Sequence, residues 1–71
     1  MTKVSTVIQS QLNDVMFLMD FMDDVDARDA AMASLLMTKR LVAIYKDTST
    51  LVSDETLDEI YSEVAISFQN I

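Results

Sequence analysis

Glycine and proline are both absent from the 71 residues of this chain. These two residues form most tight turns and end most helices, so few positions in the sequence force regular structure to stop. The chain is instead well supplied with alanine, leucine, methionine and glutamate, which favour helices. The sequence therefore predicts an all-α fold.

A first helix is predicted over about residues 4–24. Its apolar residues recur at intervals of three and four, which is the spacing of one helix face. This stripe consists of Val4, Ile8, Leu12, Val15, Met19 and Met22. A short strand over Thr2–Ile8, as in ribbon-helix-helix repressors, is the weaker alternative, because Lys3 is the only base there to meet a phosphate.

A break is predicted at Asp24–Asp26, with Asp26 as the N-cap of a second helix over about residues 27–46. One continuous helix through this point remains an open alternative. The second helix carries apolar residues on nearly all its sides, so we expect it to be the central helix of the fold.

A third helix is predicted over about residues 54–70. Ser53 precedes it as an N-cap, and Val52 is placed to pack on Leu57 as a hydrophobic staple. The apolar face of this helix is the most regular in the chain. That face consists of Leu57, Ile60, Tyr61, Val64, Phe68 and Ile71.

Together these helices predict a single domain over residues 1–71, folded as a small three-helix bundle. A chain of this length buries only roughly 60% of its unfolded surface. Because 51% of its residues are hydrophobic, one small core is too little to hide them all. This excess favours a bundle that self-associates into a homo-oligomer. A long helical hairpin that forms a dimeric bundle is the alternative architecture.

Twelve acidic residues against five basic ones give the chain a net charge of −7. Direct binding to nucleic acid needs a basic footprint, and an anionic membrane repels such a chain as well. A protein with a basic surface is the natural partner, because opposite electrostatic fields speed association. No apolar run reaches the roughly 18–20 residues of a membrane span, and the N-terminus lacks a signal-peptide pattern. We therefore expect a cytoplasmic protein.

Catalysis and metal binding have little support in the sequence. Histidine and cysteine, which supply the usual general base, nucleophile and metal ligands, are both missing. The aspartates of residues 20–29 lack the glycine and the terminal glutamate of an EF-hand loop. We therefore expect no enzyme activity, no cofactor and no metal site.

The main candidate binding residues lie in the stretch from Val15 to Asp29, where an apolar block runs directly into a cluster of aspartates. Two aromatic residues, Phe17 and Phe21, lie off the apolar stripe of the first helix. They are either part of a wider core or the anchors of an interface. Three aspartates are predicted at the negative end of that helix, at a cost of roughly 0.3–1 kcal/mol each. These carboxylates, which are either solvated or the rim of a site for a basic partner, belong to Asp20, Asp23 and Asp24.

The outer side of the third helix adds a second group of candidates. Glu55, Glu59 and Glu63 recur at intervals of four, and Ile66 lies on the same side. Like charges at this spacing repel mildly, so the row is either a solvated face or is covered by something basic. Of these residues, Glu59, Glu63 and Ile66 join the predicted binding site. One candidate cover, within the chain or from a second copy, is the basic row Arg28, Lys39 and Lys46.

These features predict a non-enzymatic protein that binds and regulates or inhibits another protein with a basic surface. One specific form is an inhibitor of a nucleic-acid-processing enzyme that mimics the charge of DNA, such as an anti-defence protein of a phage or another mobile element. The alternative function is a small chaperone or accessory subunit that buries the amphipathic helix of a partner in its own groove.

Overall fold

A computed structural model describes residues 1–69 of the chain. It contains three α-helices, one turn of 3-10 helix (η1) and two very short strands. Their order is β1 (Thr2–Lys3), α1 (Val4–Leu18), η1 (Met19–Phe21), α2 (Val25–Ile44), β2 (Leu51–Val52) and α3 (Asp54–Gln69). The three helices pack against one another, which confirms the predicted all-α three-helix bundle.

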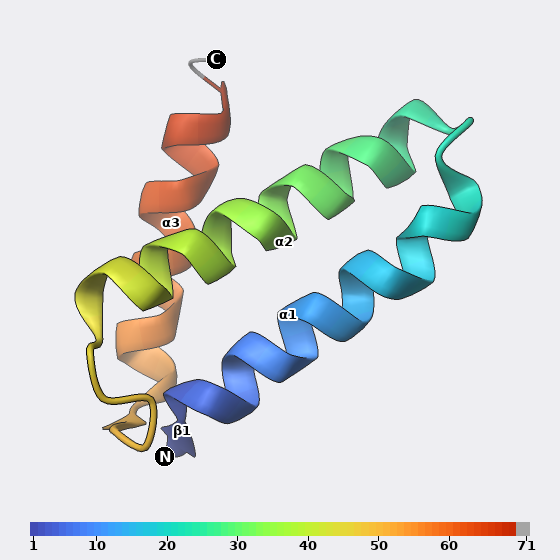
Figure 1. The fold of residues 1–71 in the computed structure, drawn as a ribbon. Coiled ribbons are helices and arrows are strands. Elements are labelled where there is room, and N and C mark those ends of the chain that lie inside the picture. The colour runs from blue at the N-terminus through green and yellow to red at the C-terminus, as the bar shows by residue number, and fades with distance from the viewer. Residues whose placement is uncertain (70–71) are drawn as a thin grey trace.

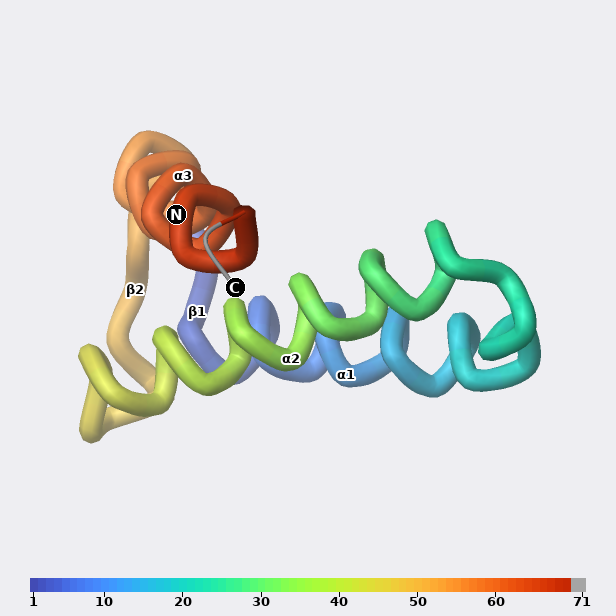
Figure 2. Tube along the Cα trace, turned by 90° about the horizontal axis from the view of Figure 1, so that it is seen from above, coloured from blue at the N-terminus to red at the C-terminus, as the bar shows by residue number. Residues whose placement is uncertain are grey.

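The helices form two layers. α1 and α2 run antiparallel as a long hairpin, and α3 lies across one side of it (Figures 1 and 2). α3 covers the end of the hairpin where α1 begins and α2 finishes. The other end, formed by the last turn of α1, η1 and the start of α2, extends beyond α3. We call this second part the hairpin end.

The hydrophobic core lies where α3 covers the hairpin. Its buried members are Val4, Val7, Met37, Leu41, Val52, Ile60 and Val64. Half-buried side chains that pack around them are Ile8, Leu36, Tyr45 and Leu57. α2 packs against both other helices, as expected of the central helix. One polar side chain is buried beside this core: the amide of Gln11 donates a hydrogen bond to the Tyr61 hydroxyl and links α1 to α3.

The two strands hold the start of the chain against the segment before α3. They are antiparallel, with Thr2 opposite Val52 and Lys3 opposite Leu51. The adjoining loop also accepts the first two amide groups of α1, because Val4 and Ser5 donate to the carbonyls of Thr50 and Thr48 at 2.9 and 2.8 Å. These carbonyls replace a side-chain cap, which α1 lacks. The alternative of a strand as far as Ile8 is therefore wrong beyond Lys3.

The helical structure is interrupted between the first two helices, so the alternative of one continuous helix is wrong. α1 ends at Leu18, well before the predicted end near residue 24. The N-cap of α2 is Asp24 rather than Asp26. Its carboxylate accepts hydrogen bonds from the amides of Asp26 and Ala27 at 2.8 and 3.4 Å. The cap lies two residues earlier than predicted because this side chain already satisfies the first free amides of α2.

The start of α3 follows the prediction. The Thr56 amide donates to the Ser53 hydroxyl at 3.2 Å, and the helix begins at Asp54. Val52 is buried in the core, and Leu57 packs against the same cluster. α2 ends at Ile44, two residues before the predicted end, because Tyr45 adopts an extended backbone. The predicted last residue of the third helix, Asn70, and the last member of its predicted apolar face, Ile71, lie outside the described residues.

The buried face of α1 differs from the predicted stripe. Val4 belongs to the core as predicted, and Val7 and Gln11 are buried beside it. Met19 and Met22, at the far end of the stripe, are exposed. The reason is the position of α3, which packs only on the first half of α1 and leaves the later apolar residues without a third helix. Within residues 1–69, none of the helices is both long and apolar enough to cross a membrane.

Candidate binding site at the hairpin end

The two phenylalanines of the predicted site form an exposed pair. Phe17 lies in the last turn of α1 and Phe21 in η1, and their ring centroids are 5.4 Å apart with the planes tilted by 48°. The exposed fractions of the two residues are 66% and 49%. The interpretation as a wider core is therefore wrong for both rings. A tilted pair at this separation is a favourable aromatic contact, so the rings present one preformed apolar surface.

The three aspartates of the predicted site are exposed around the same turn. Asp20 lies in η1 between the two phenylalanines, and Asp23 lies in the turn that follows. Asp24 has a different role from the predicted one. As the N-cap of α2 it lies at the positive end of a helix, where a carboxylate is stabilised. Only Asp20 and Asp23 therefore lie near the negative end of α1 without a capping role.

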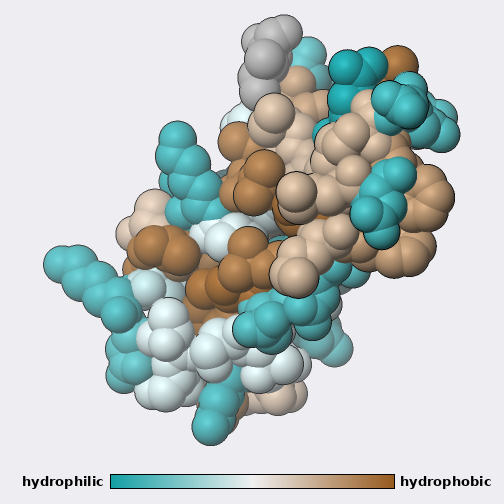
Figure 3. All heavy atoms as spheres, turned by 45° about the vertical axis from the view of Figure 1, so that its right-hand side comes forward, coloured by the Kyte–Doolittle hydropathy of each residue, from teal (hydrophilic) through white to brown (hydrophobic). Residues whose placement is uncertain are grey.

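We call Phe17, Asp20, Phe21, Asp23 and Asp24 the hairpin-end patch. Further exposed apolar side chains border it, and they belong to Met19, Met22 and Val25. In Figure 3, where the hairpin end comes forward, apolar surface in tan and brown is interrupted by hydrophilic side chains in teal. None of the patch carboxylates has a basic partner among residues 1–69, in which the one ion pair joins Arg40 and Glu63.

The remaining predicted residues lie on α3, away from the hairpin end (Figure 1). Glu59 is exposed, and Ile66 has an exposed fraction of 61%. The Arg40 guanidinium of α2 donates to the Glu63 carboxylate at 3.1 Å, so one base of the same chain covers part of the acidic row. The structure thus divides the predicted residues into two surfaces at different ends of the molecule.

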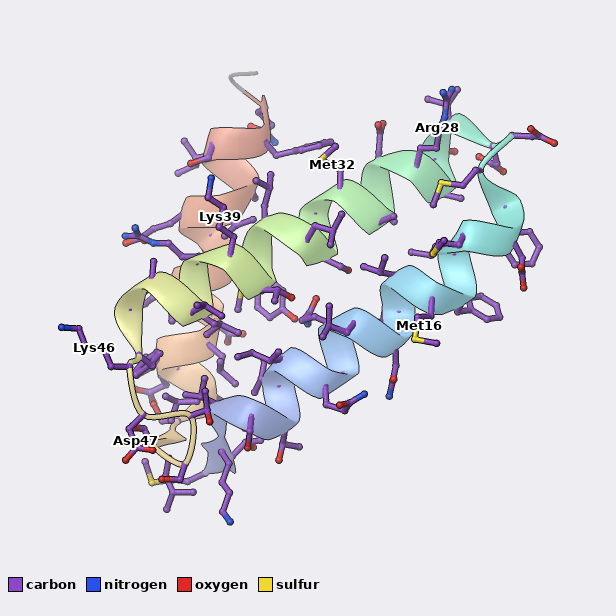
Figure 4. The ribbon with its side chains drawn as sticks, viewed as in Figure 1. Met16, Arg28, Met32, Lys39, Lys46 and Asp47 are labelled. Carbon is purple, nitrogen blue, oxygen red and sulfur yellow. The ribbon has the colours of Figure 1, made fainter. Side chains whose placement is uncertain are left out.

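Sequence reasoning missed a groove between α2 and α3. Its volume is about 510 Å³, and it is lined by Leu36, Lys39, Arg40, Ala43, Glu63, Val64, Ile66 and Ser67. We call it the α2–α3 groove. Lys39 extends from α2 on the side where α3 lies, whereas Lys46 points away from it (Figure 4). The only signal in the sequence was the basic row, and it did not reveal which of its members face α3.

No group of three potential metal-ligating side chains comes together within residues 1–69. In the loop after α2, hydrogen bonds from the Ser49 hydroxyl and amide lower the pKa of the Asp47 carboxyl below its ordinary value. These bonds measure 2.6 and 2.9 Å and shape a turn.

The chain matches no model of a protein family, no curated protein and no solved structure.

Proposed function

We propose that this protein binds and regulates another protein, and that the hairpin-end patch is its recognition surface. The observation that carries the proposal is the exposed Phe17–Phe21 pair set among unpaired carboxylates. The matching partner surface is basic at its rim and apolar at its centre. Such a surface removes the rings from water and places cations beside Asp20 and Asp23.

The free energy of burying the two phenylalanine side chains, which the free protein does not gain, supports this assignment. Fully burying a phenylalanine side chain stabilises by roughly 1.5–3 kcal/mol, and aromatic anchors dominate many interfaces. A chain of this size has few large side chains to fill its core, yet two of its three phenylalanines lie at the surface. A partner that covers both rings recovers this energy.

The charge of the molecule narrows the class of partner. A net charge of −7 with exposed carboxylates at the hairpin end and along α3 resembles the field of a nucleic acid. We propose that the partner is a nucleic-acid-processing enzyme, and that the protein inhibits it by occupying its basic binding surface. Anti-defence inhibition by a mobile element is one biological setting that fits this chemistry.

The first test compares two baits in affinity capture followed by mass spectrometry. The wild-type protein is expected to capture a basic protein that the Phe17→Ala/Phe21→Ala variant loses. Both rings are exposed, so the variant keeps its helical circular dichroism and melting temperature. Affinity for the captured protein should fall by several kcal/mol, as for interface anchors. Equal capture by both baits contradicts the assignment of the patch.

The second test measures the charge contribution with the captured partner. The Asp20→Asn/Asp23→Asn variant should associate more slowly and show a flatter dependence on salt, because rim charges act mainly on the association rate. Asp24 is left unchanged, because it caps α2. Duplex DNA should compete with the wild-type protein for the partner. Failure of DNA to compete contradicts charge mimicry but leaves recognition by the patch standing.

The accessory-subunit function remains the second proposal, and the α2–α3 groove is the observation that favours it. The groove holds about 510 Å³, which suits a few anchoring side chains of a partner. Burial in an apolar groove changes little with salt, whereas charge recognition weakens steeply. A salt titration of the captured complex therefore separates the two functions.

A further inference from the structure

The α2–α3 groove is a basic site on an acidic molecule. Four of the five basic residues of the chain lie in α2 or just after it, and two of them, Lys39 and Arg40, line this groove. The rest of its lining is Leu36 and Ala43 from α2 and Glu63, Val64, Ile66 and Ser67 from α3, so the groove is largely apolar and has two bases against one acid. Lys39 forms no ion pair within residues 1–69, and Arg40 has only its exposed contact with Glu63. A ligand for this groove is therefore apolar at its centre and carries carboxylates.

The hairpin-end patch of the same chain has this chemistry. Two phenylalanine rings stand together, and Asp20 and Asp23 lie beside them. We propose that the α2–α3 groove of one copy takes the hairpin end of a second copy. Phe17 and Phe21 enter the apolar groove, and Asp20 and Asp23 approach Lys39 and Arg40.

Charge selects this contact over others between two copies. Each chain carries a net charge of −7, so most surface pairs repel. The groove and the patch are opposite in sign and both apolar at their centres, so attraction and burial act at the same place. Leu35 and Val42 are exposed apolar side chains of α2 that do not line the groove, and Val42 serves as the comparison in the test.

The geometry makes this contact head-to-tail. Asp24 caps the start of α2 and Lys39 lies 15 residues further along the same helix, which corresponds to roughly 20 Å of rigid helix. The hairpin end therefore points away from the groove of its own chain (Figure 1). A contact between two different surfaces leaves one groove and one patch free in each dimer. Further copies can therefore add, and they form either a closed ring or an open filament.

This inference goes beyond the proposed function and does not depend on it. Self-association and partner binding share the patch, so they compete. In the first proposed function, recognition by the hairpin-end patch, the groove takes part only in self-association. Variants of the groove therefore separate the two proposals, because they abolish assembly and leave capture of a partner intact.

The test is a complementation experiment by sedimentation velocity. The groove variant is Lys39→Glu/Ile66→Glu, and both positions are exposed, so the fold is retained. The patch variant is Phe17→Ala/Phe21→Ala. The wild-type protein should grow in mass with concentration, and each variant alone should associate at least about tenfold more weakly. An equimolar mixture of the two variants should form a heterodimer that grows no further, because it contains one intact groove and one intact patch.

The matched control is Val42→Glu/Lys46→Glu, which makes the same changes of charge and polarity on exposed residues of α2 and its end, outside the groove. This control should assemble like the wild-type protein once the added negative charge is screened by salt. Three results overturn the proposal: a wild-type protein that stays monomeric at its highest soluble concentration, a variant mixture without heterodimer, or a control that loses assembly while the groove variant keeps it.

Discussion

Asp24 shows how one residue in an acidic cluster differs from its neighbours. It is one of five aspartates within ten residues, all of them exposed. Its carboxylate accepts the Asp26 and Ala27 amides, whereas the side chains of Asp20 and Asp23 make no hydrogen bond or ion pair within residues 1–69. The same residue type therefore caps a helix at one position and has no bonding partner in this part of the chain at the other two.

Replacing Asp24 by alanine should lower the free energy of unfolding by about 1 kcal/mol, because the first amides of α2 lose their acceptor. Urea denaturation monitored by circular dichroism measures the change. Asp20→Ala and Asp23→Ala are the matched controls and should leave the free energy of unfolding within about 0.5 kcal/mol of the wild-type value. Equal losses at all three positions would show that the cap contributes nothing specific.

Asp47 provides the pH-dependent prediction. The Ser49 hydroxyl and amide donate to its carboxylate and lower its pKa in the folded protein. Because the folded pKa lies below the unfolded one, the turn is stabilised at pH values above the unfolded pKa. This stabilisation is lost as the pH falls through the folded pKa.

Ser49→Ala removes the hydroxyl donor, which is the larger cause, and keeps the amide. The titration midpoint of the Asp47 carboxyl, followed by NMR, should therefore move up toward its ordinary value. Thr48→Ala, a neighbouring exposed change, should leave the midpoint in place. An Asp47 titration midpoint that is unchanged by Ser49→Ala would contradict the hydrogen-bonded turn.

At the scale of elements, α3 has a buried side, which should not tolerate a charged substitution, and an exposed side, which should tolerate one. Val64 is buried in the core, and Ile66, two residues on, has an exposed fraction of 61%. Val64→Asp should unfold the domain, because an unpaired buried charge costs several kcal/mol and so small a core has little reserve.

Ile66→Asp is the matched control and should keep the helical circular dichroism and the melting temperature nearly unchanged. The two thermal melts, recorded under the same conditions, make the comparison. A Val64→Asp protein that melts like the Ile66→Asp protein would mean that α3 packs through another face.

The elements differ in how far their sequence determines them. Ser53, Val52 and Leu57 define the start of α3 locally, and the structure places all three as predicted. The end of α1 was not predictable from its stripe, because the apolar spacing continues to Met22 although α3 does not cover that region. Helical spacing identifies a face, whereas burial of the face depends on where a distant element lies.

The candidate site was predictable in composition but not in arrangement. The sequence identified Phe17 and Phe21 as residues off the main stripe, and only the position of α3 decides that they are exposed. The separation of Glu59, Glu63 and Ile66 from the hairpin end is likewise a property of the tertiary fold. The α2–α3 groove depends on two helices at once, so no single periodic pattern reveals it.

For the whole molecule, the main asymmetry is that the core lies at one end. All seven residues of the core cluster come from the part of the hairpin that α3 covers, from β2 or from α3 itself. Toward the hairpin end, Ala31 is the one buried residue between α1 and α2. Stability should be distributed in the same uneven way, because local opening is easiest where few apolar contacts must break.

Native-state hydrogen exchange should therefore show two levels of protection. Amides around Val7, Met37 and Leu41 should exchange only through global unfolding, whereas those of residues 18–28 should exchange through a smaller opening. Measurements at a concentration where the protein is monomeric isolate this effect. Addition of a captured partner should slow exchange at the hairpin end first. Uniform protection along α2 would contradict a core confined to one end.

The pairing of β1 with β2 has a consequence for the order in which the chain folds. Thr2 and Val52 are 50 residues apart in sequence, whereas α1 and α2 meet across one short turn. Closing the longer loop costs more chain entropy, so the hairpin should form first and the strands should join late. Weakening the strand pair, for example by Leu51→Gly, should then speed unfolding and leave the refolding rate nearly unchanged. The two residues that begin the regular structure would thus pair last during folding and separate first during unfolding.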